Sequence, residues 1–361
     1  MTESILAGLA VATAVWFIGA WYLRGPDLSA FDIPKDGAPV AHWQRFSTGD
    51  SLNDEHRAVV ATLSGVTDIV KSTPRARQLA ALRTYMDNMF SDKPLDARFV
   101  PLNAAGVRGE WVLAPGADPN RRTLYIHGGA YTMGSPLSHR AITSRFSEIT
   151  GGAVLAIDYR LMPENRRIAG VEDCRTAYRW VLESGPDGPA TAKTLFVAGD
   201  SAGGNLTLSL LAWVRDQGLR APDAAVALAP QTDSTLGSPS LKSNLATDAM
   251  LGPLFAPLAR IPRSVMLWGG WFQTRIRPND PRISPVFGDL AQLPPLLIHA
   301  SESEMLRDDS IRYFNKARAA GSPVKLQTWN HVVHVWHIFN PELTEARDAF
   351  EEIRKFLAKA C

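Results

Sequence analysis

A serine between small residues is the feature of this sequence with the clearest chemical potential. The motif Gly-Asp-Ser-Ala-Gly at 199–203 follows the apolar run 195–198 and precedes a helix-forming stretch at 206–214. A nucleophilic serine needs this strand–turn–helix context, because the sharp turn lifts its hydroxyl above the sheet and tolerates only small neighbours. The N-terminus of the helix also favours negative charge that develops there. The pattern predicts Ser201 as a nucleophile for acyl transfer.

Donors for the oxyanion of such a reaction are predicted upstream of the serine. His-Gly-Gly-Ala-Tyr at 127–131 directly follows the apolar run 124–126. Backbone N–H groups stabilise an oxyanion where no side chain blocks close approach, which is why glycines suit the task. Gly128 and Gly129, with the amide of Ala202, form the predicted oxyanion hole, and Ala130 keeps a small residue beside them. The alternative interpretation is a glycine-rich turn without a catalytic role.

A base and an acid should follow the serine in the order serine, acid, histidine. The histidine takes the serine proton and returns it to the leaving group, while the carboxylate orients the imidazole. The C-terminal part of the chain offers several candidates for each role, and their spacing does not choose among them. The candidate bases are His331, His334 and His337, and the candidate acids are Glu302, Glu304, Asp308 and Asp309.

Alternating apolar strands and helices must position these groups. Strands are predicted at 109–113, 123–126, 153–157, 195–198, 224–228 and 295–300, and helices at 138–150, 171–183, 206–214 and 310–319. Apolar strands separated by helices indicate an α/β fold with a mostly parallel central sheet and helices on both faces. Helical periodicity at 54–70 and 76–90, with a tryptophan-rich insertion at 250–271, predicts a helical cap over the site.

The cap supplies most of the predicted substrate contacts. These contacts are Tyr131 from the oxyanion segment and Met250, Leu251, Trp268 and Trp271 from the insertion. Packing between cap and core is the alternative interpretation for each residue taken alone. Together, an apolar and aromatic cap favours a lipophilic ester over a sugar or a charged acid.

Composition excludes several other classes of protein. The chain has 361 residues, 45% of them hydrophobic and 20% charged, as in an ordinary globular protein with a sizeable core. A net charge of +2 with scattered basic residues argues against nucleic-acid binding. Two cysteines, Cys174 and Cys361, imply no disulfide framework. The histidines lack the spacing of a metal site, and neither a metal nor a cofactor is expected.

A run of 19 residues without a charge, at 5–23, is the unusual feature of the N-terminus. At helical rise it is about long enough to cross a hydrocarbon core of ~30 Å. Trp16, Trp21 and Tyr22 gather toward its end, as in an interfacial aromatic belt. We expect a single-pass membrane anchor, with a signal peptide and a buried core helix as the alternatives. Arg24, the nearby positive charge, favours a cytoplasmic catalytic domain.

From about residue 76 onward, the sequence resembles the hormone-sensitive-lipase family of α/β-hydrolases, and most of all the bacterial esterases that include monoterpene ε-lactone hydrolase. The segments that carry the resemblance are 127–131, 158–164, 172–174, 199–205, 284–285, 306–310 and 334–339. The resemblance implies an α/β-hydrolase fold, ester hydrolysis without a cofactor, and a homodimer. It also implies His334 as the base and Glu304 as the acid, in a position where aspartate is commoner, with Asp308 as the rival acid. The sequence departs from the family pattern at 165–170 and in the loop before the base, where His331 and Val333 replace a glycine and a proline.

We therefore expect three parts: a transmembrane anchor at 1–24, a helical cap and linker at 25–95, and a catalytic α/β-hydrolase domain at 96–361 with a cap insertion at about 245–278. The predicted function is that of a membrane-anchored serine carboxylesterase, which hydrolyses lipophilic esters with short-to-medium acyl chains through an acyl-enzyme. Its predicted partners are a small ester substrate and, through the anchor, membrane lipid. A lactone hydrolase or an aryl amide deacetylase on the same triad is the nearest alternative. A ligand receptor on an inactive hydrolase fold is a further one, although such a receptor would be expected to lose a triad member.

Overall fold

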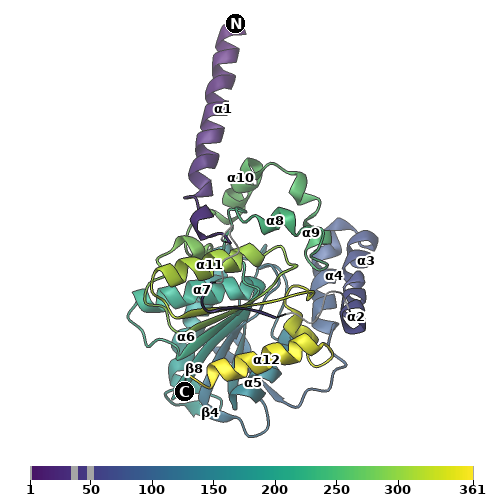
Figure 1. The fold of residues 1–361 in the computed structure, drawn as a ribbon, viewed down its shortest axis with the longest axis vertical. Helices are drawn as coiled ribbons and strands as arrows, with labels where there is room; N and C mark the ends of the chain where they lie inside the picture. The colour runs from purple at the N-terminus through teal and green to yellow at the C-terminus, as the bar shows by residue number, and fades with distance from the viewer. Residues whose placement is uncertain (1, 34–39, 47–52, 361) are drawn as a thin grey trace.

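A nine-stranded sheet forms the centre of the computed structural model, which describes residues 2–33, 40–46 and 53–360 (Figure 1). The strands stand in the order β1-β11-β10-β9-β8-β4-β5-β3-β2, and neighbours run parallel from β1 across to β5. β3 and β2 join antiparallel at the far edge. In chain order the strands are β1 (Trp43–Phe46), β2 (Arg98–Ala104), β3 (Val107–Leu113), β4 (Asp118–Ile126), β5 (Gly152–Asp158), β8 (Thr194–Asp200), β9 (Ala224–Leu228), β10 (Leu296–Ser301) and β11 (Val324–Trp329). Two short strands, β6 (Ser184–Gly185) and β7 (Gly188–Pro189), pair separately. Two terminal residues lie outside the described residues. They are Met1, the first residue of the predicted anchor, and Cys361, the last residue of the predicted catalytic domain.

Helices cover both faces of the sheet because its strands are apolar on both sides. Along β4, Leu124 and Ile126 belong to one buried cluster and Tyr125, between them, belongs to the other. The first cluster packs against α6 (Arg167–Glu183), α7 (Ser201–Asp216) and α11 (Arg307–Ala319), and the second against α5 (Arg140–Thr150) and α12 (Thr344–Leu357). This alternation is what a parallel sheet buried on both faces requires. The predicted α/β-hydrolase fold, with a mostly parallel sheet between two helical layers, is confirmed.

The segment expected as cap and linker contributes to the sheet as well. Its strand β1 pairs in parallel with β11, from Trp43 opposite Leu326 to Phe46 opposite Trp329, and forms one edge. The helix expected over 54–70 is two helices that meet at Leu63, α2 (Asp54–Thr62) and α3 (Ser64–Ser72). The sheet therefore begins before residue 96, and the predicted boundary between linker and catalytic domain is wrong for β1.

Helices from two distant parts of the chain lie over the carboxyl ends of the parallel strands (Figure 1). We call them together the cap. They are α2, α3 and α4 (Arg75–Asn88), and from the later segment α8 (Ser240–Ser243), α9 (Gly252–Phe255) and α10 (Arg263–Thr274). Short 3-10 helices are η1 (Ser29–Phe31), η2 (Leu137–His139), η3 (Leu258–Arg260), η4 (Pro285–Phe287) and η5 (Trp336–Phe339).

Hydrogen bonds from the guanidinium of Arg83 on α4 connect the first part of the cap, α2 to α4, to the α/β domain below it. The guanidinium donates to the Glu164 carboxylate at 2.8 and 2.9 Å and to the Thr132 carbonyl at 2.7 Å. On the next turn of α4, Asp87 accepts a hydrogen bond of 2.5 Å from the Ser135 hydroxyl. The cap is thereby attached to the loop that follows β4.

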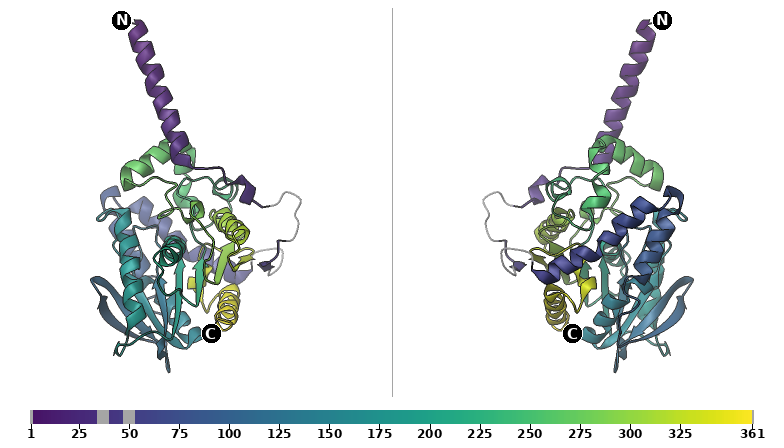
Figure 2. Two further views of the ribbon diagram at one scale, coloured as in Figure 1. Left: turned by 90° about the vertical axis from the view of Figure 1, so that its left-hand side faces the viewer. Right: turned by 90° about the vertical axis from the view of Figure 1, so that its right-hand side faces the viewer.

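α1 (Thr2–Arg24) projects from the body as a single helix (Figures 1 and 2). The stretch Leu6–Phe31 is long and apolar enough to cross a membrane, and only 11% of its most apolar window is buried. Leu6, Val11 and Phe17 are exposed, whereas Ala20 and Leu23 near the end of the helix are buried. This exposure contradicts the alternative of a buried core helix.

Candidate active site

Ser201 lies at the sharp turn between β8 and α7, as the motif predicts. Its φ of 52° falls in the left-handed region, which costs energy for a residue with a side chain. A side chain at Gly203 would overlap the Ile126 carbonyl oxygen, and a Cβ at Gly199 would lie 2.6 Å from the Thr207 hydroxyl oxygen. The two glycines are therefore needed for the turn to pack against β4 and α7.

A chain of hydrogen bonds joins Ser201 to a histidine and a glutamate. His334 Nε2 lies 2.8 Å from Ser201 Oγ, and His334 Nδ1 lies 2.5 Å from Glu304 Oε2. The other carboxylate oxygen of Glu304 accepts from the Ser301 amide at 2.7 Å, which fixes its orientation. Glu304 follows β10 and His334 follows β11, so the carboxyl ends of parallel strands bring the three together. The arrangement has the geometry of a nucleophile, a general base and an orienting acid.

The rival acids and bases have other partners. Asp308 accepts from the Ser240 amide and pairs with Arg307, and Asp309 accepts from the amides of Thr232 and Asp233. Glu302 lies beside Arg45 and Arg307. His337 Nε2 lies 2.9 Å from His299 Nδ1 in the core, and the ring of His331 lies edge-on to that of His56. Only Glu304 and His334, among these candidates, join Ser201.

Burial and charge act in opposite directions on the buried base. Burial disfavours the imidazolium of His334, but the hydrogen bond and the negative charge of Glu304 outweigh it and raise the pKa of His334 above its ordinary value. Burial raises the pKa of Glu304, against the lowering effect of its hydrogen bond to His334. The carboxylate thus makes the histidine a stronger base than an isolated imidazole at this depth.

The predicted oxyanion donor Gly128 is already engaged. Its N–H donates to the Asp200 carboxylate at 3.1 Å, so this part of the prediction is wrong. The N–H groups of Gly129, Ala130 and Ala202 donate to no other group in the described part of the chain. Gly129 and Ala130, with φ of 108° and 52°, also line the cavity in front of Ser201. The donor set that fits the geometry is therefore shifted by one residue.

Asp200 was not among the predicted site residues, although it stands inside the motif. Its buried carboxylate accepts from the Tyr125 hydroxyl at 2.7 Å and from the Gly128 amide, and lies 3.3 Å from His139 Nε2. Burial opposes the charge on both partners, yet their attraction prevails, lowering the pKa of Asp200 and raising that of His139. Asp200 thus connects the serine turn directly to residues 127–131, which hold two of the oxyanion donors and which we call the oxyanion loop. An acid directly before the serine is the sequence signal that could have indicated this role.

An apolar cavity of about 170 Å³ opens in front of the serine. Met250 and Leu251, predicted as substrate contacts, line it. The cavity is bounded by both halves of the cap and by residues of the triad and oxyanion loop: Leu63, Val66, Leu82, Tyr85, Met86, Met89, Phe90, Gly129, Ala130, Met133, Ser138, His139, Asp200, Ser201, Met250, Leu251, Leu254, Phe255, His334, Val335, Ile338 and Phe339.

Three predicted substrate contacts lie elsewhere. The Tyr131 hydroxyl donates to Gln231 at 2.5 Å, and its ring lies 3.5 Å from the guanidinium carbon of Arg167, so it packs behind the site. Trp268 and Trp271 form an aromatic cluster on α10, where Trp268 stacks on Trp16 of α1. For these residues the alternative interpretation, structural packing, is the correct one. No group of three His, Cys, Asp or Glu side chains that could hold a metal occurs within residues 2–33, 40–46 and 53–360.

Comparison with known proteins agrees with this geometry. A family model described as alpha/beta hydrolase fold matches residues 123–338. An acetyl-hydrolase from Streptomyces hygroscopicus is 39% identical over 70% of this chain and 79% of its own length. An esterase from Acinetobacter venetianus is 33% identical over 79% of this chain and 91% of its own. A solved esterase of the bacterial hormone-sensitive lipase family superimposes with a TM-score of 0.75 at 33% identity, covering 86% of this chain and 99% of that one. The chain therefore belongs to the hormone-sensitive-lipase family of α/β-hydrolases and is a carboxylesterase-type hydrolase.

Proposed function

We propose that the protein cleaves carboxylic esters through an acyl-enzyme on Ser201. His334 takes the serine proton as the hydroxyl attacks the carbonyl carbon, and then returns it to the leaving alcohol. Glu304 holds the imidazole in the required tautomer, and the amides of Gly129, Ala130 and Ala202 stabilise the oxyanion. In the second half of the reaction, water gives a proton to His334, attacks the acyl-enzyme and releases the acid, and the proton returns to Ser201. The observation that carries the proposal is the Ser201–His334–Glu304 chain of hydrogen bonds, opening into an apolar cavity.

The substrate we propose is a lipophilic ester with a short-to-medium acyl chain. The cavity volume of about 170 Å³ is small beside the roughly 300–1,000 Å³ of typical ligand pockets. Apolar side chains line most of it, and its charged residues, Asp200 and His139, are paired with each other. A relative named acetyl-hydrolase supports the short end of this range. A lactone or an aryl amide could react on the same triad, but the relatives named esterase and carboxylesterase favour the ester.

We also propose that α1 anchors the enzyme in a membrane as its N-terminal unit, followed by the cap and the catalytic domain. Its 23 residues at about 1.5 Å each give ~34 Å, enough to cross a hydrocarbon core of ~30 Å. The exposed apolar side chains of α1 support lipid as its partner. The cytoplasmic side and the homodimer stay predictions, which protease protection of the membrane-bound chain and its mass in detergent would test.

A series of p-nitrophenyl esters from acetate to palmitate tests the substrate class. For the full chain in detergent, kcat/KM should peak between about four and eight acyl carbons and fall for longer chains, because the cavity is too small for them. Lactones and acylated anilines of the same acyl length serve as the comparison. A peak at palmitate would contradict the acyl range, and faster cleavage of a lactone or an anilide would replace the ester as substrate.

Replacing Asp200 with serine should lower kcat by roughly 10²-fold with little change in KM. The shorter side chain cannot reach the Gly128 amide, so the oxyanion loop loses its support, and the loss should be of the size of one oxyanion donor. Asp200→Asn is the matched control, because its amide oxygen can still accept from Gly128. Steady-state kinetics of both variants, with their melting temperatures, decide the matter: equal losses in kcat would rule out this positioning role.

A further inference from the structure

The cap carries an apolar face that no part of the described chain covers. Over α10, residues 264–274 include no charged side chain. Val265 and Phe272 on this helix are 43% and 54% exposed, and Leu258 and Ile261 just before it are exposed as well. We call these four residues the outer cap face. Exposed apolar residues gathered within one short segment are typical of a surface that contacts a partner or a membrane.

This face is joined to α1. Trp268 stacks on Trp16 with ring centroids 5.5 Å apart, and its indole N–H donates to the Trp16 carbonyl at 3.2 Å. The ring of Trp268 occupies the space that a side chain at residue 19 would need, so Gly19 permits the close approach. In both views of Figure 2 the helix α10 lies against the lower part of α1. The outer cap face is therefore continuous with the surface of the proposed anchor.

The depth of this contact follows from helix geometry. Trp16 lies eight residues before Arg24, or about 12 Å along the helix axis. A span that needs ~30 Å of apolar helix places Trp16 within the bilayer rather than above it. With α1 across a bilayer, α10, which packs at this level of α1, would carry its apolar side chains to the depth of the lipid.

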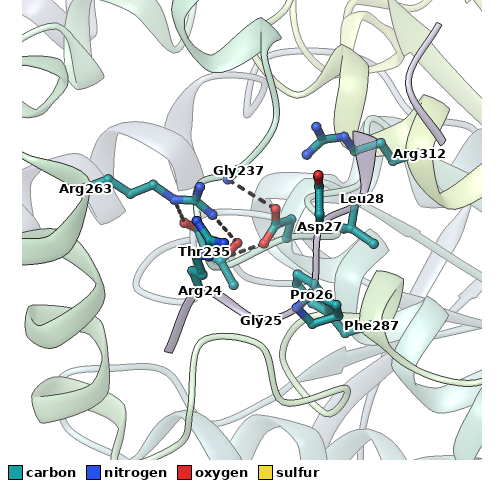
Figure 3. A pocket seen from close by; sticks show the side chains of 11 residues that line it. Arg24, Gly25, Pro26, Asp27, Leu28, Thr235, Gly237, Arg263, Phe287 and Arg312 are labelled. Atoms are coloured by element: carbon teal, nitrogen blue, oxygen red, sulfur yellow. Dashed lines mark hydrogen bonds between the residues drawn. The ribbon is translucent and has the colours of Figure 1, made fainter. Parts of the chain in front are cut away.

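Arginines surround the base of this apolar region. Arg277 donates to the Tyr22 hydroxyl at 2.5 Å, and the guanidinium of Arg275 lies 5.6 Å from the centre of the Phe272 ring. A polar pocket of about 180 Å³ lies at the foot of α1, where Arg24, Arg263 and Arg312 approach from three different helices and Asp27 and Asp233 also line the space (Figure 3). The exposed arginines below the apolar face, Arg24, Arg275 and Arg277, complement the phosphates of lipid headgroups, and aromatic side chains are common at the same level.

We propose that the outer cap face inserts into the bilayer and that lipophilic esters enter the catalytic cavity from the lipid. Phe255, which is 37% exposed, lines the cavity and lies three residues before Leu258, so one short segment of the chain reaches both the outer cap face and the cavity lining. Substrate that dissolves in lipid would thus reach Ser201 without crossing water. This inference rests on the proposed anchor.

Fluorescence quenching on the full chain in phosphatidylcholine vesicles tests the insertion. A bimane label is placed on Phe272→Cys in a Cys361→Ser background, where Cys174 is buried. The control is Asp348→Cys on α12, at the other end of the molecule (Figure 1). The label at 272 should be quenched at least twofold by lipid with a doxyl group near its head, and little by aqueous iodide, whereas the label at 348 should show the reverse.

The possible results distinguish a failure of the insertion from a failure of the membrane anchor or of the catalytic proposal. If iodide quenches the label at 272 as strongly as the label at 348, the insertion is overturned. Flotation of the same chain with vesicles would in that case still support the anchor. Shielding from both quenchers would mean that another protein chain covers the face, which also overturns it. A chain that does not float with vesicles would refute the anchor and the insertion together. Hydrolysis of soluble p-nitrophenyl butyrate, measured in each sample, reports on the catalytic proposal independently.

Entry from lipid is tested by a second pair of variants. Val265→Glu places a charge on the outer cap face, and Val60→Glu places one at a similarly exposed apolar residue of α2, 37% exposed and away from this face. For Val265→Glu, hydrolysis of an ester dissolved in vesicles should fall at least tenfold relative to hydrolysis of a soluble ester. For Val60→Glu this ratio should stay as in the wild type. Equal ratios in the two variants would overturn entry from lipid.

Discussion

Replacing Ser201 with alanine is expected to lower kcat for p-nitrophenyl butyrate by about 10⁵- to 10⁶-fold. The alanine removes the atom that forms the acyl-enzyme and leaves only the oxyanion donors and the cavity, which alone give a small residual rate. The backbone strain should not change, because alanine keeps the Cβ that makes a φ of 52° costly. The melting temperature should therefore stay within a few degrees of the wild type.

Steady-state kinetics of the purified variant measure this effect, and His334→Ala provides the comparison. Residues that act as a unit lose activity together, so the double variant should be hardly slower than either single one. A folded Ser201→Ala protein that keeps more than about one hundredth of the wild-type rate would refute a serine nucleophile. Additive losses in the double variant would contradict the proposal that the two residues serve one step.

Glu304→Gln is expected to lower kcat by about 10⁴-fold and to change the pH profile. The glutamine can donate its amide N–H to His334 Nδ1, which forces the proton onto Nε2 and leaves no lone pair for the serine proton. In the wild type, His334 must be neutral to act, so kcat/KM falls as the pH drops through its pKa. Because Glu304 raises this pKa, the acid limb should lie above about pH 6.5.

Glu304→Gln removes the negative charge that raises the pKa of His334, and this pKa sets the position of the acid limb. Burial, which lowers the pKa of His334, then acts without the opposing carboxylate, and the midpoint should move to lower pH. Asp308→Asn is the matched control, since Asp308 stood as the rival acid but bonds to Ser240 and Arg307. A midpoint that does not move in Glu304→Gln, or that moves equally in Asp308→Asn, would reject Glu304 as the partner of the base.

Local patterns in the sequence were enough to predict the serine turn and six of the nine strands of the sheet, whereas β1, β2 and β11 were not predicted. A strand buried on both faces is continuously apolar, as at 195–198, and a turn as tight as that of Ser201 admits only small neighbours. β1 escaped prediction because Trp43–Phe46 is a short edge strand with two polar residues in its centre. Such a strand is defined by its pairing with β11 and not by its own residues.

The errors at the site arise from contacts between distant segments. The sequence predicts Gly128 as a free donor, because nothing near it in the chain reveals that Asp200 accepts its N–H. The sequence predicts Trp268 as a substrate contact, because its partner Trp16 is more than two hundred residues away, on the helix expected to lie in the membrane. Spacing also left the acid undecided, and the family resemblance rather than the residue pattern favoured Glu304.

The charged pair of Asp200 and His139, fully buried beside the serine, creates a conflict between thermostability and turnover. Removing two charges from water costs free energy that their attraction recovers only in part, and well-packed apolar replacements of such pairs often stabilise proteins by ~1–4 kcal/mol. The same replacement here would release the Gly128 amide and the loop that holds the oxyanion donors. Laboratory evolution for heat resistance should therefore gain stability at this pair at the expense of the reaction, unless activity is selected at the same time.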